Sequence, residues 1–137
     1  AARLGSRETR HVTGLHTLTG EELLSGKQFE DTIACSAHPI DIHYPADTSQ
    51  DLIYLECPGY IPYRSLVPRH HKNLIVAGRC ISADEKAFAS LRVQAPAMAT
   101  GQAAGAASAL SLSENVCFQD LNTQNLQDLL RKQNAEI

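Results

Sequence analysis

The chain has 137 residues, a formal net charge of −3 at neutral pH and a hydrophobic content of 43%. Its length suits one domain or a part of a larger one. A slightly acidic chain with scattered basic residues argues against general nucleic-acid binding. No apolar run is long enough to span a bilayer. Length and charge therefore favour a globular chain that binds neither nucleic acid nor membrane.

The segment before residue 30 predicts an extended stretch followed by a short helix. Residues 6–18 alternate loosely between apolar and polar side chains, as an extended segment does. Thr19 and Glu22 then have the spacing of a capping box, which marks the start of a helix. Gly26 is typical of the residue that ends such a helix.

Short strands are predicted between residues 31 and 68. Residues 31–43 alternate and are rich in β-branched side chains, but Pro39 interrupts them. This pattern fits two short strands or one bent edge strand. Residues 52–57 read LIYLEC and predict a further strand. Residues 60–68 are expected to be extended, because prolines lie at both ends of that segment.

The most informative stretch runs from residue 73 to residue 110. Residues 73–77 form a short apolar run that stops at Gly78, which predicts a buried strand followed by a polar crossing. Pro96 suits the first turn of the helix that follows. Residues with almost no side chain recur along that helix at Ala97, Gly101, Ala104 and Ser108. Such a helix can approach another backbone or a flat ligand closely, and its first N–H groups can bind an electron-rich oxygen.

The chain ends in an amphipathic helix. Asn122 is a good N-cap, and Leu126, Leu129 and Leu130 form the apolar stripe. The order of elements is strands and loops first, then helices, without a regular βαβ alternation. The predicted class is therefore α+β, with short strands followed by an Ala/Gly-rich helix and a C-terminal amphipathic helix.

The four cysteines are far apart in the sequence, at Cys35, Cys57, Cys80 and Cys117. They form no CxxC or CxxH pair, which a structural zinc site normally shows. Most of them adjoin apolar runs, so we expect free, buried thiols and no metal site. The sequence does not determine where the protein is located. Free thiols favour a reducing compartment such as the cytoplasm.

Several segments together resemble one family. They are AGRCIS, ASLR and MATGQAAGAASAL, preceded in order by RETRHVTG, HTLTGEELLSGKQFEDTIA, HPIDIH and YIPYRSLVP. They resemble the C-terminal end of FAD-dependent oxidoreductases related to the glutathione-reductase and succinate-dehydrogenase-like flavoproteins. The resemblance implies a fragment of an α/β FAD-binding fold. It divides residues 1–137 into a β-rich substrate-side segment (6–72), the second half of the FAD site (73–112) and a C-terminal helix (113–137).

The resemblance also implies which residues contact the cofactor: Gly78, Arg79, Arg92, Val93, Ala97 and Met98. In this family Gly78 and Arg79 would approach the FAD phosphate or ribitol. The segment 92–98 would pass the isoalloxazine ring. The backbone N–H groups of Ala97 and Met98 would donate toward the flavin N1–C2=O edge. A helix N-terminus there would stabilise the negative charge of the reduced flavin.

The chain contains no GxGxxG phosphate-binding loop. The resemblance therefore covers only the second half of a FAD site and implies an N-terminal Rossmann-type segment as its partner. Gly101 and Gly105 are expected to let the small-residue helix lie against the main sheet. FAD and a small-molecule substrate are the expected ligands of the full-length protein.

Two residues are candidates for catalysis, and each has a structural alternative. His43 could transfer protons, or it could be a hydrogen-bonded histidine at a strand end. Arg92 could anchor the flavin or a substrate carboxylate, or it could form a surface salt bridge. His38, Asp41 and His43 are not spaced to place three metal ligands on one face of a strand.

The expected function is that of the FAD-contacting portion of a flavin-dependent oxidoreductase that acts on an unidentified small organic substrate. As an isolated chain it is expected to be inactive. The alternative is a non-catalytic structural or binding module that does not hold FAD by itself. A small hydrolase is the least favoured class, because the sequence shows no nucleophile elbow and no Cys–His signature.

Overall fold

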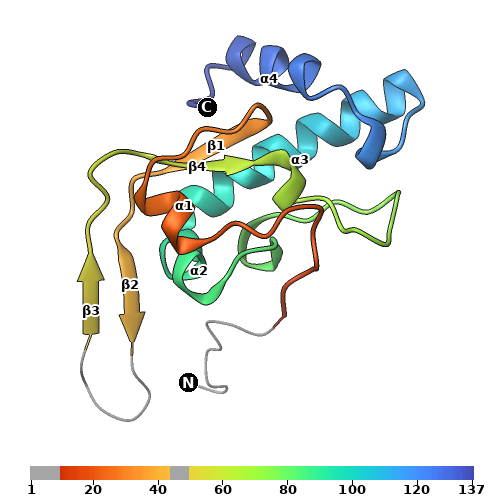
Figure 1. The fold of residues 1–137 in the computed structure, drawn as a ribbon. Helices are drawn as coiled ribbons and strands as arrows, with labels where there is room; N and C mark the ends of the chain where they lie inside the picture. Colours follow the sequence, from red (N-terminus) through yellow and green to blue (C-terminus); the bar gives the residue numbers. More distant parts are fainter. Residues whose placement is uncertain (1–9, 44–49) are drawn as a thin grey trace, which may run out of the picture.

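The computed structural model describes residues 10–43 and 50–137. Within them the strands are β1 (Thr32–Ser36), β2 (Ile40–His43), β3 (Gln50–Ile53) and β4 (Gly59–Pro62), and the helices are α1 (Gly20–Leu24), α2 (Glu85–Leu91), α3 (Gln94–Glu114) and α4 (Thr123–Lys132) (Figure 1). Short 3-10 turns lie at Tyr63–Ser65, Gly78–Cys80 and Phe118–Asp120. This order confirms the predicted α+β class, in which strands precede a small-residue helix and an amphipathic helix.

The four strands form two antiparallel pairs along one ribbon, β1 with β4 and β2 with β3. Ser36 pairs with Gly59 and Ile40 with Ile53, so residues 37–39 lie opposite the longer segment 54–58. Pro39 has no N–H to donate across this gap. The prediction of two short strands around Pro39 is therefore confirmed. The strand predicted at 52–57 is confirmed only over its first two residues, since the rest leaves the ladder.

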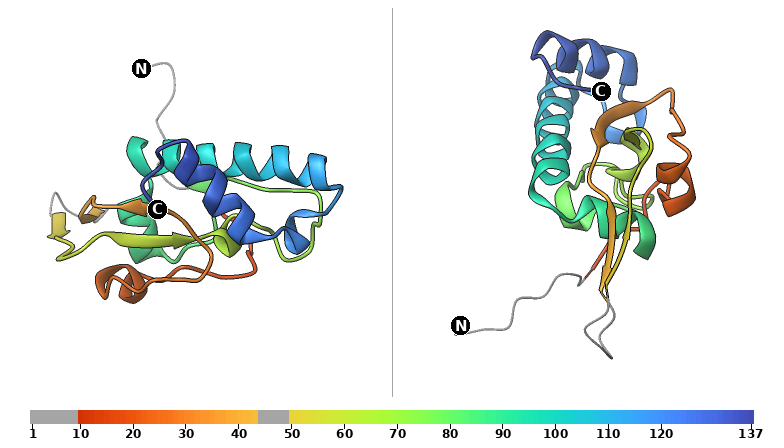
Figure 2. Two further views of the ribbon diagram at one scale, coloured as in Figure 1. Left: turned by 90° about the horizontal axis from the view of Figure 1, so that it is seen from above. Right: turned by 90° about the vertical axis from the view of Figure 1, so that its left-hand side faces the viewer.

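The β1–β4 pair lies between two helical layers. α3 packs on one face, α1 packs against β4 on the other, and α4 crosses α3 and the end of β1 (Figure 2). The β2–β3 hairpin projects from this body (Figure 1). The largest fully buried side chains include Leu18, Leu23, Ile33, Ile61, Leu66, Leu91, Leu126 and Leu130. Burial of each such side chain contributes roughly 1.5–3 kcal/mol, so this core holds both helical layers to the ribbon.

The start of α1 follows the sequence prediction in detail. Thr19 Oγ1 accepts from the Glu22 N–H at 3.2 Å, and Glu22 Oε2 accepts from the Thr19 N–H at 3.1 Å. This is the predicted capping box, and Gly26 follows the helix with φ +60°. Of the extended segment predicted at 6–18, residues 6–9 lie outside the described part, and Gly14 and Leu18 form isolated β-bridges.

Glu22 carries an unusual set of partners for a surface helix. Its carboxylate accepts from Lys27 Nζ at 2.8 Å and from His16 Nε2 at 2.9 Å, besides the Thr19 N–H. Burial raises the pKa of Glu22, but the hydrogen bonds from Lys27, His16 and Thr19 together outweigh it and lower the pKa from 4.5 to about 2. The folded chain therefore keeps this carboxylate ionised at pH values where the unfolded chain protonates it.

We expect the stability of the fold to depend on pH through Glu22. Its contribution is fully present above pH 4.5 and is lost as the pH falls through about 2. The free energy of unfolding, measured by urea denaturation at several pH values in that window, should decrease with falling pH. Glu22→Gln should flatten this dependence. An unchanged slope in the variant would show that the Glu22 contacts do not stabilise the fold.

The polar crossing predicted after Gly78 contains a helix that the sequence reading missed. Asp84 is the N-cap of α2, and its Oδ1 accepts from the Ala87 N–H at 2.7 Å. The signal was present, because Asp84 precedes an acidic first-turn residue and an apolar run. Similarly, residues 60–68 are extended only as far as Pro62, after which the chain turns.

The buried strand predicted at 73–77 is wrong for this chain. These residues form no strand, and Leu74 is 43% exposed. Val76 N–H donates to the Leu66 carbonyl at 3.0 Å, but no strand in residues 10–43 and 50–137 runs alongside this segment. A strand needs a neighbour to pair its backbone groups, so apolar composition alone does not create one here.

The four cysteines are free, as predicted, but none of them is buried. Cys57 and Cys80 are exposed, and Cys35 and Cys117 are half-buried. Proximity to apolar runs misled the prediction, because Cys35 takes the half-buried position of β1 and the other three lie in turns and loops. In the described part of the chain, no three His, Cys, Asp or Glu side chains gather as a metal site would require. None of its helices combines the length and hydropathy of a membrane span.

Candidate functional site

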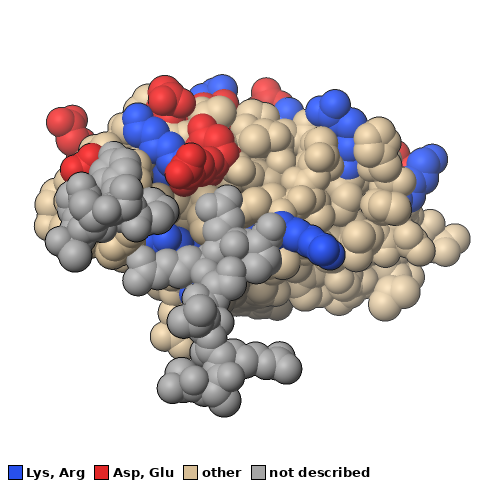
Figure 3. Space-filling view, turned by 90° about the horizontal axis from the view of Figure 1, so that it is seen from below, with Lys and Arg blue, Asp and Glu red and all other residues tan. Residues whose placement is uncertain are grey.

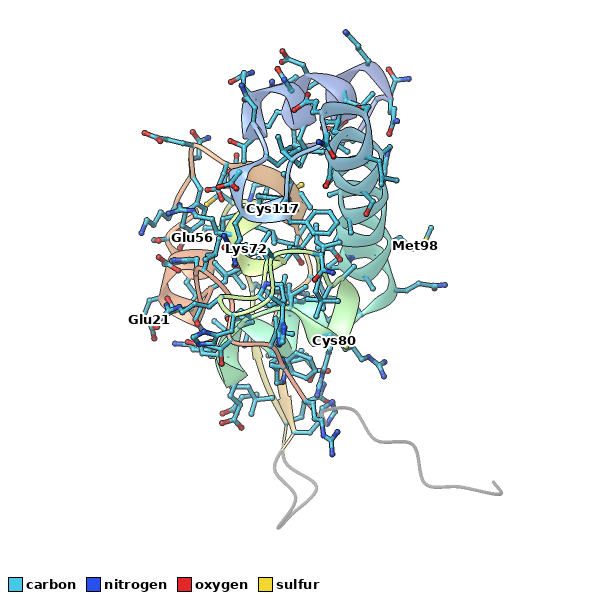
Figure 4. All side chains as sticks on the ribbon, turned by 90° about the vertical axis from the view of Figure 1, so that its right-hand side faces the viewer. Glu21, Glu56, Lys72, Cys80, Met98 and Cys117 are labelled. Atoms are coloured by element: carbon cyan, nitrogen blue, oxygen red, sulfur yellow. The ribbon has the colours of Figure 1, made fainter. Side chains whose placement is uncertain are left out.

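Helix α3 has a buried face and an open face. The buried residues are Pro96, Thr100, Ala103, Ala106 and Ala107. On the open face Met98 is 67% and Leu112 is 84% exposed, and Figure 4 shows Met98 directed away from the body of the molecule. A Cβ added at Gly101 or Gly105 would meet no atom within 4 Å. Within the described residues these glycines therefore do not bring α3 against a strand. Their expected packing on a main sheet stays a prediction.

The N-terminus of α3 is free of side-chain caps. Val93 is the N-cap and makes no side-chain capping hydrogen bond. The first intrahelical hydrogen bond joins the Ala97 N–H to the Val93 carbonyl at 3.2 Å. The uncommitted first-turn donors are consequently those of Gln94 and Ala95, since Pro96 has no N–H. Pro96 lies in the first turn of α3, as predicted. The N–H of Ala97, one of the two expected donors, already donates to the Val93 carbonyl, and the contact of Ala97 and Met98 with the flavin stays a prediction.

Gly78 approaches this end of α3 through its backbone. Its φ is +65°, a conformation that glycine adopts without strain. Its N–H donates to Thr100 Oγ1 at 3.0 Å, and Thr100 in turn donates to the Pro96 carbonyl at 2.8 Å. A Cβ at Gly78 would lie 3.5 Å from the Ala97 Cβ. The turn at Gly78 is thus fixed to the first turns of α3.

Two arginines flank the same end of the helix. Arg92 is the C-cap of α2 and directly precedes Val93, and Arg79 Nε donates to the Arg92 carbonyl at 3.0 Å. We call this region the α3 corner; it comprises Gly78, Arg79, Arg92, Val93, Gln94, Ala95 and Ala97. Guanidinium groups and an uncapped helix N-terminus both favour negative charge. The α3 corner therefore fits an electron-rich or anionic group, and Met98 lies on the next turn.

Arg92 also connects the α3 corner to the β2–β3 hairpin. Its Nη2 donates to the Asp41 carbonyl oxygen at 2.8 Å and lies 3.4 Å from Asp41 Oδ2. His43 Nε2 is 2.9 Å from the same Oδ2, and Gln50 Nε2 donates to Oδ1 at 2.7 Å. Arg92 is only 14% exposed. The structural alternative for Arg92, a salt bridge, is thus present, although it is partly buried and adjoins the predicted site.

Asp41 is the residue that sequence reasoning missed. Burial raises its pKa, but hydrogen bonds from Gln50 and His43 and the charges of His43 and Arg92 outweigh it, so the pKa is lowered. A cavity of about 180 Å³ beside it is lined by Asp41, Ile42, His43, Glu85, Phe88, Ala89 and Arg92. The available signal was the spacing of Asp41 and His43, which puts two residues of a strand on one face.

Other hollows are larger, but they are lined by residues outside the α3 corner. One of about 340 Å³ adjoins Asp31 and Arg64, whose side chains already satisfy each other at 3.0 Å. On the face seen from below, acidic and basic side chains lie next to one another (Figure 3). That face presents no continuous field of one sign, so charge does not mark it as a binding surface.

Comparison with known proteins places the chain in one family. The model of the family described as FAD dependent oxidoreductase matches residues 1–130. No curated protein and no solved structure matches the chain. The match spans the α3 corner and the hairpin, and it confirms the sequence-based expectation at the level of the family.

Proposed function

Since the chain belongs to the FAD-dependent oxidoreductase family, we propose that its α3 corner contacts FAD in the full-length protein. One observation carries the proposal: the uncapped N-terminus of a 21-residue helix meets a glycine with φ +65°. The helix end offers free N–H donors, and glycine allows a ligand to approach the backbone. We also propose that the chain is related to the glutathione-reductase and succinate-dehydrogenase-like flavoproteins. In this proposal residues 6–72 form the substrate-side segment, 73–112 the second half of the FAD site and 113–137 the C-terminal helix.

The residues of the α3 corner would hold and tune the cofactor. FAD, when bound, supplies the acceptor for a hydride or an electron pair. The N–H groups of Gln94 and Ala95 would stabilise nearby negative charge by ~0.3–1 kcal/mol, and by more where water is excluded. Gly78 and Arg79 would contact the phosphate or ribitol side. His43 would hold or release a proton on the substrate side, and the substrate would be a small organic molecule.

The open face of α3 is suited to packing against another segment of the full-length protein. Gly101 and Gly105 have free space above them, while Met98 and Leu112 are exposed next to them. Exposed apolar side chains beside bare backbone suit close packing by another element. We therefore assign this face to the N-terminal Rossmann-type segment that would carry the first half of the FAD site. Its GxGxxG loop has no counterpart in this chain.

A second candidate function remains. The chain could be a structural or binding module that lacks FAD, and the absence of GxGxxG from its sequence favours this reading.

The free thiols of Cys57 and Cys80 suit a reducing compartment, and we propose a cytoplasmic location on that ground.

Flavin content separates the two functions. The purified 137-residue chain is expected to be colourless, because half of the cradle for FAD lies outside it. The full-length protein is expected to be yellow and to release FAD on denaturation, as measured by absorbance and chromatography. A yellow 137-residue chain would show a self-sufficient site. A full-length protein that stays colourless after incubation with FAD would refute the flavoenzyme and leave the binding module.

A further inference from the structure

We infer that Asp41 is the positioning residue of the substrate side: it holds His43 so that the Nδ1 atom is the free proton acceptor, and it ties that histidine to Arg92. The chemical use of this arrangement depends on the proposed function. The arrangement itself depends only on contacts within this chain. Sequence spacing alone had assigned no role to Asp41.

The Asp41 carboxylate is fully engaged. Oδ1 accepts from Gln50 Nε2 at 2.7 Å, and Oδ2 lies 2.9 Å from His43 Nε2 and 3.4 Å from Arg92 Nη2. The Asp41 carbonyl oxygen accepts a further hydrogen bond from Arg92 Nη2 at 2.8 Å. One residue therefore joins β2, β3 and the C-terminus of α2.

These contacts determine which nitrogen of His43 carries hydrogen. The pKa of Asp41 is lowered despite its burial, by the hydrogen bonds from Gln50 and His43 and by the nearby charges, so the carboxyl group is ionised near neutral pH. An ionised carboxylate only accepts hydrogen bonds, so His43 Nε2 must be the donor. In a neutral ring Nδ1 then has a free lone pair and can accept a proton.

The position of the pair suits a role beside the α3 corner. The His43 side chain is 37% exposed, so a small molecule can reach it. The cavity of about 180 Å³ next to it is also lined by Arg92, which leads directly into Val93 at the start of α3. Glu85 is the further charged residue on that cavity. The opening thus places a proton acceptor and a cation within one small space.

The tautomer of His43 is the direct test. We would record two-bond ¹⁵N–¹H correlations of the imidazole rings in the labelled 137-residue chain and assign His43 from its loss in His43→Gln. The neutral wild-type ring should show hydrogen on Nε2 and none on Nδ1. Asp41→Ala should give a mixture of the two tautomers, and Asp41→Asn, which keeps the shape and removes the charge, should shift the ratio in the same direction.

Asp128→Asn is the matched control, because it removes one exposed carboxylate of α4 far along the sequence from the hairpin. It should leave the His43 pattern unchanged. Amide spectra would verify that each variant keeps the β1–β4 pair. Hydrogen on Nδ1 in the wild-type chain, or a tautomer ratio that does not respond to either Asp41 substitution, would overturn the inference.

Kinetic measurements on the full-length protein distinguish an Asp41 that positions His43 from an Asp41 that only stabilises the hairpin. Asp41→Asn should lower kcat about tenfold and His43→Gln about 100-fold, with smaller changes in KM. The double variant should be no slower than His43→Gln, because Asp41 acts through His43. Additive losses would refute positioning. A full-length protein without FAD would refute the proposed function, whereas the tautomer result would stand.

Discussion

Asp31→Ala is expected to lower the free energy of unfolding by about 3 kcal/mol. The Asp31 side chain is 8% exposed and accepts from Arg64 Nε, Arg64 Nη2 and the Arg64 backbone N–H, each at 3.0 Å. The bidentate geometry makes this pair stronger than an ordinary surface ion pair. It joins the start of β1 to the turn that follows β4. Its loss leaves the backbone N–H of Arg64 without its acceptor.

Urea denaturation would measure this effect through the midpoint at unchanged slope. Asp128→Ala is the matched control, since Asp128 and Arg131 form an ion pair whose side chains are 54% and 53% exposed. That change should cost less than about 1 kcal/mol. If both variants lose the same small amount of stability, the Asp31–Arg64 pair is no stronger than a solvated one.

The sequence predicted contacts between residues close together in the chain, but it did not predict the Asp31–Arg64 pair. The capping box of Thr19, the break at Pro39 and the N-cap at Asn122, whose side chain accepts from the Gln124 and Asn125 N–H groups, all appear where the local pattern places them. These features depend on residues within a few positions of one another. The Asp31–Arg64 pair spans 33 positions, and no local pattern indicates it.

The strand predicted at 73–77 shows the complementary limit. Its composition is that of a buried strand, yet Leu74 is exposed and the segment pairs with no neighbour among the described residues. The open face of α3 also lacks a neighbour among the described residues, since a Cβ at Gly101 or Gly105 would meet no atom within 4 Å. Both features are what a segment would retain if its partner were carried elsewhere.

The sequence predicted which residues make up the candidate site, but it did not predict the hydrogen bonds that join them. Gly78, Arg79, Arg92, Val93 and Ala97 meet at one corner. The resemblance indicated their grouping, whereas the start of α3 at Gln94 and the link from Arg92 to Asp41 depend on tertiary packing. The assignment of these residues to FAD stays a prediction that the flavin measurements test.

Gly105 allows the proposed partner face to be tested by one residue in two contexts. In the 137-residue chain, Gly105→Ala should raise the free energy of unfolding by about 1 kcal/mol, because Ala favours a helix interior over Gly. Gly105→Leu should also be tolerated there, since a Cβ at this position meets nothing within 4 Å. Thermal or urea unfolding of the chain would measure both effects.

In the full-length protein the same Gly105→Leu change should be harmful. If a Rossmann-type segment packs on this face, the added side chain overpacks the interface at a cost of roughly 1–3 kcal/mol, which corresponds to roughly a 5- to 150-fold weaker retention of FAD. Flavin released per protein after denaturation would measure it. Equal flavin content in Gly105→Leu and wild type would mean that no backbone lies against Gly105. The open face of α3 would then be solvent-exposed in the whole enzyme, and the first half of the FAD site would have to meet the α3 corner from another side.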